Sequence, residues 1–296
     1  MIHYRPTPSD AWTGRSTSIH EPAAYWYQLV KCSDFSSGEF PAASAALIGY
    51  SCDEGVSRNQ GRIGAKAGPA AIRARLGKVA NHLVDKQVID LGDAICEDGD
   101  MGACQARYAE MITKSIQQKT LPIGLGGGHD IAFGTFMGTW NAVKSHEKKR
   151  IGIINLDAHF DLREPASYGT SGTPFKQILD SYGEFVNYYA VGIQRAANTE
   201  SLFKVAEADN IHYLENDYLY LTIDLDGFSS AYAPGVSAPS PMGFSPEFAL
   251  KWITVLLNSE KVVACDLAEL NPDLDRDNST ANLAARLVEA IVRLKS

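Results

Sequence analysis

Two short stretches of the sequence carry carboxylates and an imidazole at alternating positions. Asp157, His159 and Asp161 follow an apolar, β-branched run, and Asp224 and Asp226 end another. In an extended chain, residues two apart point to the same side. If both runs are strands of an open α/β sheet, these side chains project where such sheets bind their ligands. The pattern predicts a metal site, although each residue alone could be an ordinary loop residue.

His129 follows three glycines, residues 126–128, which allow a close approach of backbone and metal because they have no side chain. The combined set has four carboxylates and two imidazoles. Buried carboxylates need compensation, and two divalent cations would supply +4 against −4. Oxygen-rich ligation without thiolate favours manganese, with magnesium second, over zinc. We therefore expect two Mn2+ per chain, with six ligands: His129, Asp157, His159, Asp161, Asp224 and Asp226.

A pair of metal ions lowers the pKa of a bridging water and provides hydroxide at neutral pH. The ligand set therefore predicts a hydrolase that attacks an electrophilic carbon. Glu269 follows a further apolar run, so its carboxylate is expected at the same edge, where it would pair with a cationic substrate. The alternative for Glu269 is an acid on a surface loop.

Apolar runs alternate with amphipathic segments along the chain, which predicts a mainly parallel sheet covered by helices on both faces. We expect one domain of three α/β/α layers at residues 43–296, with residues 1–42 as an N-terminal extension packed on it. Residues 211–214 are ambiguous, because a strand there would leave no room for a crossover helix before residue 218. Either this strand has an unusual pairing with the next one, or a loop is missing near residues 214–218. The predicted strands are 43–50, 88–95, 120–125, 151–157, 185–192, 219–226 and 261–268, and the helices are 69–76, 100–118, 130–140, 174–181, 198–208, 246–258 and 280–295.

Composition excludes several classes of partner. The chain has 296 residues and a formal net charge of −8, which disfavours nucleic acid and anionic membranes as partners. No apolar run approaches the length of a membrane span. Five scattered cysteines without a C-x-x-C pair indicate reduced thiols in a cytoplasmic protein. The glycine-rich stretch 53–73 lacks both G-x-G-x-x-G and G-K-[ST], which argues against a nucleotide phosphate site.

The motifs together resemble the ureohydrolase superfamily of arginases, agmatinases and formimidoylglutamases. They are Gly-Gly-Gly-His-Asp at 126–130, Asn-Leu-Asp-Ala-His-Phe-Asp at 155–161, Thr-Ile-Asp-Leu-Asp at 222–226 and Asp-Leu-Ala-Glu-Leu-Asn-Pro at 266–272. The sequences at 56–65, 171–175 and 191–194 are most similar to formimidoylglutamases. The resemblance implies an arginase-like fold and cleavage of N-formimino-L-glutamate to L-glutamate and formamide by metal-bridging hydroxide.

The resemblance also implies roles for the ligands. His129 and Asp161 would hold one manganese, His159 and Asp226 the other, and Asp157 would bridge both. Asp224 is implied as the second bridging ligand. The implied catalytic residues are Asp226, which would relay the proton to the departing amine, and Glu269, which would hold the cationic nitrogen of the substrate.

Two positions depart from the arginase pattern. Phe175 stands where arginases carry a proton-shuttle histidine, and Arg163 stands where they carry asparagine. A guanidinium suits a substrate carboxylate and would repel agmatine. The other candidates for the substrate rim are Ser171 and Thr173, for which a turn or cap role is equally plausible, and Gln194 and Asn198, which could contact the second carboxylate. Arg62 is a further candidate, with a structural ion pair as the alternative.

Other functions are compatible with parts of this pattern. A related ureohydrolase could act on a guanidino acid and release urea, as guanidinobutyrases and arginases do. A mononuclear zinc deacetylase would leave His129 without a role, and a catalytically silent metal-binding scaffold should lack one of the six ligands. We expect a small-molecule substrate and a homo-oligomer.

Overall fold

The predicted strands form one sheet in the computed structural model, which describes residues 3–8, 10–17, 23–83, 85–144, 150–166, 168–208 and 217–295. The strands are β1 (Tyr4–Arg5), β2 (Lys31–Cys32), β3 (Ala45–Ser51), β4 (Val88–Ile95), β5 (Leu121–Leu125), β6 (Ile151–Leu156), β7 (Val186–Val191), β8 (Tyr218–Asp224) and β9 (Val262–Ala268). Their order is β1-β4-β3-β5-β9-β8-β6-β7, and β2 also pairs with β4. All pairs are parallel except β1 with β4.

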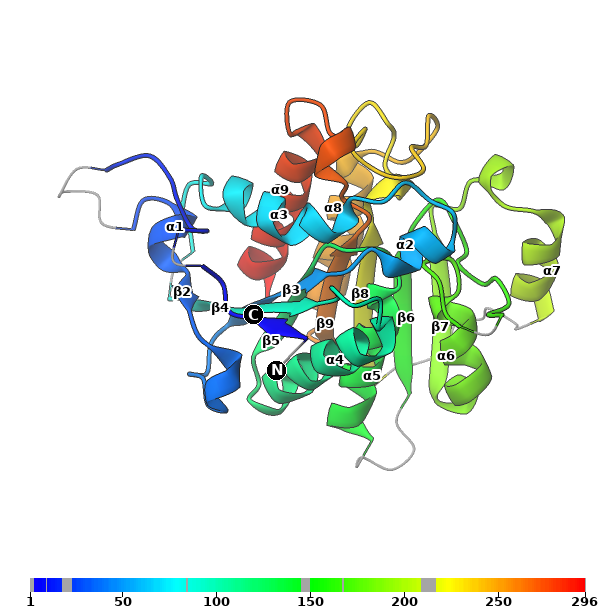
Figure 1. The fold of residues 1–296 in the computed structure, drawn as a ribbon, viewed down its shortest axis with the longest axis horizontal. Coiled ribbons are helices and arrows are strands. Elements are labelled where there is room, and N and C mark those ends of the chain that lie inside the picture. Colours follow the sequence, from blue (N-terminus) through cyan, green and yellow to red (C-terminus); the bar gives the residue numbers. More distant parts are fainter. Residues whose placement is uncertain are drawn as a thin grey trace.

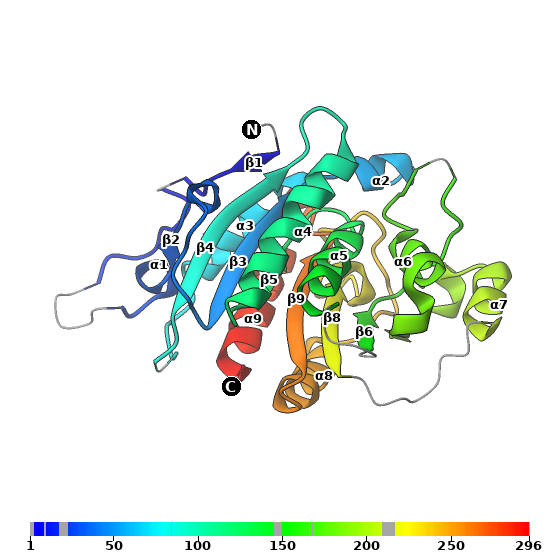
Figure 2. The same ribbon diagram turned by 90° about the horizontal axis from the view of Figure 1, so that it is seen from below.

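Helices cover both faces of this sheet (Figures 1 and 2). They are α1 (Trp26–Leu29), α2 (Glu54–Arg58), α3 (Gly68–Leu76), α4 (Met101–Gln117), α5 (Ile131–Val143), α6 (Pro174–Tyr182), α7 (Glu200–Ala208), α8 (Pro246–Asn258) and α9 (Ser279–Leu294). Helices α3, α8 and α9 lie on one face, and α4 and α5 lie on the other. None of the described helices combines the length and apolar character needed to span a membrane.

The predicted three-layer α/β/α architecture with a mainly parallel sheet is confirmed. Every predicted strand and helix is present, with ends that differ by three residues or fewer. Strands buried on both faces explain this agreement, because β4, β5 and β6 are mostly apolar and are buried along their whole length. Helix α2 lies in the glycine-rich stretch and was not predicted.

The segment before residue 43 extends the sheet at the edge of β4. Strand β1 pairs antiparallel with β4, strand β2 pairs parallel with it, and Trp26 is buried in the same core cluster as Leu76. The boundary between residues 42 and 43 stays a prediction.

The connection from β7 to β8 contains α7, and both strands pair with β6. Helix α7 therefore belongs to the crossover between these parallel strands. The ambiguous residues 211–214 lie outside the described part of the chain.

The register brings the ends of four central strands to one level. Leu125 of β5 and Ile223 of β8 both pair with Leu267 of β9. Leu156 of β6 pairs with Ile223. Residues that follow this row therefore meet at the carboxyl edge of the sheet, where parallel α/β sheets bind ligands.

Candidate metal centre

His129 is positioned by a tight glycine turn between β5 and α5. Gly126 and Gly127 have φ values of +66° and +84°, which favour glycine. A Cβ atom on Gly127 would lie 2.4 Å from the carbonyl oxygen of Tyr50, so only a glycine allows this approach. The turn places His129 at the start of α5, where its backbone N–H donates to Glu269 Oε1 at 2.8 Å.

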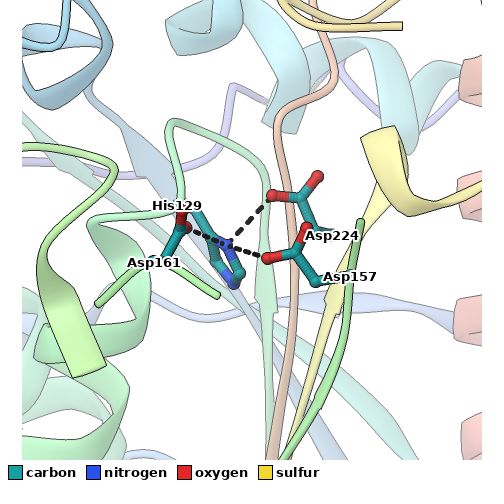
Figure 3. A group of neighbouring side chains, drawn as sticks. All are labelled: His129, Asp157, Asp161 and Asp224. Carbon is teal, nitrogen blue, oxygen red and sulfur yellow. Dashed lines mark hydrogen bonds and ion pairs between the residues drawn. The ribbon is translucent and has the colours of Figure 1, made fainter. Parts of the chain in front are cut away.

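The Nδ1 atom of His129 faces three carboxylates (Figure 3). It lies 2.9 Å from Asp161 Oδ2, 3.0 Å from Asp224 Oδ2 and 3.4 Å from Asp157 Oδ2. One potential ligand atom from each of these four residues lies within 4.8 Å of all the others. We call this group the first ligand cluster.

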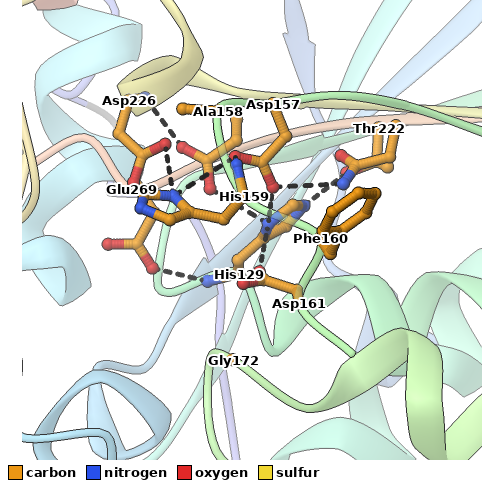
Figure 4. Close-up of polar contacts among 12 residues, drawn as sticks. His129, Asp157, Ala158, His159, Phe160, Asp161, Gly172, Thr222, Asp226 and Glu269 are labelled. Atoms are coloured by element: carbon orange, nitrogen blue, oxygen red, sulfur yellow. Dashed lines mark hydrogen bonds and ion pairs between the residues drawn. The ribbon is translucent and has the colours of Figure 1, made fainter. Parts of the chain in front are cut away.

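A second ligand cluster consists of Asp157, His159 and Asp226 (Figure 4). His159 Nδ1 lies 3.3 Å from Asp226 Oδ1 and 3.5 Å from Asp157 Oδ1. Asp157 belongs to both clusters, with Oδ2 facing the first and Oδ1 the second. Asp224 belongs to the first cluster, and its Oδ1 accepts the backbone N–H of Asp226 at 2.7 Å. The structure therefore brings all six predicted ligands together at one edge of the sheet.

The buried carboxylates of the two clusters need positive charge nearby to compensate them. Burial opposes protonation of both histidines, but the neighbouring carboxylates outweigh this effect. Asp224, Asp157 and Asp161 raise the pKa of His129 well above its usual range. Asp157 and Asp226 raise the pKa of His159 to about 12. Burial and the nearby Asp224 raise the pKa of Asp226 well above its usual range. Asp226 Oδ1 is buried without a hydrogen-bond donor among the described residues. These groups fit divalent cations, which would compensate the carboxylates and coordinate Asp226 Oδ1.

The ring of His129 contacts Thr222 and Phe175, and the sequence predicts neither contact. Its Nε2 lies 3.0 Å from Thr222 Oγ1, and Thr222 pairs in the sheet with the buried Asp266 of β9. If Nε2 carries the proton and donates to Thr222 Oγ1, Nδ1 keeps its lone pair and directs it at the carboxylates. Binding of a metal ion by Nδ1 requires this tautomer. Phe175, noted in the sequence only as a missing shuttle, packs edge-on against this ring at 5.4 Å and is fully buried.

We expect Gly127→Ala to destabilise the protein and lower its manganese content, because the strained φ and the contact with Tyr50 would move His129. The combined cost is about 2–5 kcal/mol, measurable by thermal denaturation, with metal content by mass spectrometry. Gly38→Ala is the matched control, since Gly38 has a φ of +86° but a Cβ atom added there would meet nothing within 4 Å. It should lose only about 1 kcal/mol and keep its metal. Equal losses of stability and of manganese in Gly127→Ala and Gly38→Ala would contradict this account.

Glu269 follows β9 and lies beside the first ligand cluster (Figure 4). It has a φ of +67°, and its carboxylate is buried while accepting the His129 N–H. Burial raises the pKa of Glu269 well above its usual range, and the negative charge of Asp224 adds to the increase. An ionised Glu269 therefore needs a cation beside it, either metal or substrate.

A cavity of about 350 Å³ opens above the clusters. Of the predicted rim residues, Arg62, Arg163, Ser171 and Asn198 line it, whereas Thr173 and Gln194 are not among its described lining residues. Thr173 Oγ1 instead bonds within its own turn, to Thr170 and Gln177.

Asn198 braces the loop that carries the aspartates and His159. Its Oδ1 accepts the Phe160 N–H at 3.0 Å, and its Nδ2 donates to the carbonyls of Ala158 and Gln194, each at 2.8 Å. Gln194 Nε2 donates to its neighbour Gly192. Both side-chain ends of Asn198 are thus engaged in holding the 158–160 backbone beneath the cavity.

Comparisons with known proteins identify related sequences and structures of the same fold. The model of the Arginase family matches residues 43–293. The sequence is 39% identical over 318 residues to a formimidoylglutamase from Geobacillus thermodenitrificans, covering 99% of this chain and 98% of that protein. A structure of formimidoylglutamase from Bacillus subtilis superposes with a TM-score of 0.80 at 20% identity and covers 94% of both chains. A structure of Trypanosoma cruzi formiminoglutamase with Mn2+ has a TM-score of 0.77 at 23% identity and covers 85% of this chain and 93% of that one. At these identities the two structures show the same fold.

Proposed function

The chain belongs to the arginase family, and we propose that it hydrolyses N-formimino-L-glutamate to L-glutamate and formamide at a centre of two manganese ions. The observation that carries the proposal is Asp157, whose two oxygens face two separate ligand clusters beneath one cavity. The relatives named formimidoylglutamase, at 39% identity over nearly the whole chain, support the substrate.

The donor set supports manganese and a count of two. Carboxylates and imidazoles without thiolate suit Mn2+, which the T. cruzi formiminoglutamase structure contains. We assign His129 and Asp161 to one ion and His159 and Asp226 to the other. Asp157 and Asp224 are proposed as bridging ligands. Asp157 has an oxygen in each cluster. Asp224 contacts His129 Nδ1 of the first cluster with Oδ2, and its Oδ1 accepts the backbone N–H of Asp226 of the second cluster.

When bound, the two ions would lower the pKa of a shared water and so provide hydroxide at neutral pH. Glu269 holds the cationic formimino nitrogen, since its carboxylate lines the cavity and is fixed by the His129 N–H. Asp226, whose carboxylate lines the same cavity, would relay the proton to the departing amine. The bond from the formimino carbon to the glutamate nitrogen breaks, so one water and one substrate yield formamide and L-glutamate.

Arg163 supplies a positive charge at the rim. Its Nη1 donates to Asn59 Oδ1 at 3.2 Å, and the Arg163 side chain forms no ion pair with any described residue. The guanidinium is therefore available to a substrate carboxylate, which it can bind with two parallel hydrogen bonds. Agmatine has no carboxylate and would be repelled.

Product analysis tests the proposal directly. Manganese-loaded protein should release formamide from N-formimino-L-glutamate, and no urea from arginine, agmatine or 4-guanidinobutyrate tested in parallel. Urea from a guanidino acid, with no formamide from the formimino substrate, would replace the proposed substrate by that acid.

We expect Arg163→Ala to raise KM for N-formimino-L-glutamate by about 10- to 100-fold, the value of a hydrogen bond to a charged group. Steady-state kinetics measures KM, and mass spectrometry should still find the wild-type manganese content. Arg163→Lys is the matched control, because it keeps the positive charge but loses the planar guanidinium. Its KM should therefore lie between those of the wild type and Arg163→Ala. Loss of manganese in Arg163→Ala would show that Arg163 supports the metal centre instead of the substrate.

A further inference from the structure

We propose that Arg62 binds the second carboxylate of the substrate and thereby selects dicarboxylates over monocarboxylates. This inference rests on the proposed function, since N-formimino-L-glutamate carries two carboxylates and Arg163 accounts for only one. The sequence left Arg62 open between a substrate contact and a structural ion pair.

The charges around the cavity favour the substrate contact. The described lining residues include two basic side chains, Arg62 and Arg163, which enter from separate segments of the chain. Neither forms an ion pair with a described residue, although the floor of the same cavity is acidic. The acids of the floor are assigned to the metal ions and to the cationic nitrogen. Both guanidiniums therefore remain for anions that enter the cavity.

Neutral acceptors fix the orientation of Arg62. Its Nε donates to the Ser237 carbonyl at 2.9 Å, and its Nη2 donates to the Val236 carbonyl at 2.7 Å. Its backbone N–H donates to Ser237 Oγ at 2.7 Å. The two carbonyls use two of the five guanidinium donors and leave its positive charge uncompensated. The side chain is thus held in place while Nη1 stays able to donate to a carboxylate.

The geometry also defines the competing explanation, in which Arg62 only fastens the loop at residues 236–238 to the glycine-rich stretch. Loss of a loop anchor would weaken every ligand to a similar degree. Loss of a carboxylate partner would weaken only the ligands that carry the carboxylate bound by Arg62, because a ligand that lacks this carboxylate has nothing further to lose. The ratio of affinities therefore separates the two explanations.

The test measures binding of L-glutamate, 4-aminobutyrate and 2-aminobutyrate to the manganese-loaded protein by calorimetry. The last two compounds each retain the amine and lack one of the two carboxylates. Wild type should bind L-glutamate at least about tenfold more tightly than either. Arg62→Gln should abolish this preference against one of the two and keep it against the other.

Two further variants complete the design. Ser237→Ala removes the hydroxyl that accepts the Arg62 backbone N–H and should keep both preferences, whatever its effect on overall affinity. Arg62→Lys keeps a charge without the planar fork and should retain part of the preference. Equal weakening of all three ligands in Arg62→Gln and Arg62→Lys, or no preference for L-glutamate in wild type, overturns the inference.

The outcomes for the two proposals are distinct. A preference for L-glutamate that depends on Arg62, without formamide release by wild type, would overturn only the proposed reaction. Formamide release by wild type, with no change of preference in the Arg62 variants, would overturn only the role of Arg62.

Discussion

Asp157→Asn is expected to lower kcat/KM for N-formimino-L-glutamate by at least about 10³-fold, which corresponds to about 4 kcal/mol of transition-state stabilisation. Asp157 is the residue whose oxygens face both ligand clusters, so its substitution weakens both metal sites at once. Asparagine has the same shape as aspartate. Its side-chain oxygen can still accept the backbone N–H of His159, which Asp157 Oδ1 accepts at 2.7 Å. The fold should therefore persist while manganese content falls from two ions per chain to below one, as measured by mass spectrometry after desalting.

His159→Asn is the matched control for this prediction. His159 belongs to the second ligand cluster alone, so this variant should retain the ion held by the first cluster and bind about one manganese. The two variants thus separate a shared ligand from a ligand of one site. Two tightly bound ions in Asp157→Asn would contradict the assignment of Asp157 as a bridging ligand.

The fold could be predicted because its signals are local. Strands such as β6 are buried on both faces, and a run of apolar β-branched residues fits that environment better than any helix surface. The ligands could be predicted for a related reason. Asp224 and Asp226 directly end a strand, and parallel strands place their carboxyl ends at one edge, so position along the chain already determined position in space.

The rest of the site depends on contacts between segments that are distant in the sequence. Arg62 meets the carbonyls of Val236 and Ser237 across more than 170 residues, and no local pattern indicates such a pairing. Helix α2 lies in a glycine-rich stretch that reads as a loop. It packs so closely on the start of α5 that a Cβ atom on Gly55 would lie 2.1 Å from Asp130 Oδ1.

The residues behind the ligands were missed for another reason. Thr222 lies two residues before Asp224 on the same strand, so the alternation that identified Asp224 could also have placed Thr222 on that face. Its role becomes evident only when His129 Nε2 is found 3.0 Å away. Phe175 likewise resembles any core aromatic residue until its ring is seen against His129.

Removal of manganese by a chelator is expected to lower Tm by roughly 6 °C for each ion lost. An ion at a free concentration of 1,000 Kd stabilises the native state by about 4 kcal/mol, and a chain of 296 residues changes Tm by about 1.6 °C per kcal/mol. Without the ions, the buried carboxylates in the two ligand clusters form ion pairs, among the described residues, only with His129 and His159. Differential scanning calorimetry with and without chelator measures the difference.

The difference in Tm should widen as pH rises from 6 to 9. In the metal-free protein the raised pKa values of His129 and His159 give stability that is present below about pH 6.5 and is lost as pH rises towards the folded-state values. The raised pKa values of Asp226 and Glu269 act in the same direction, since their neutral forms favour folding and are lost as pH rises above about 4. The lowered pKa of Asp157 affects stability only below about pH 4.

Manganese binding has the opposite dependence on pH, because the ligands must lose their protons to bind the ion. The metal-free protein should therefore become less stable over the same range in which the ion binds more tightly. Asp157→Asn, which is expected to hold little metal, should show almost no effect of chelator at either pH. A difference in Tm that narrows between pH 6 and pH 9 in the wild-type protein would mean that these buried histidines and carboxylates do not ligate the ions.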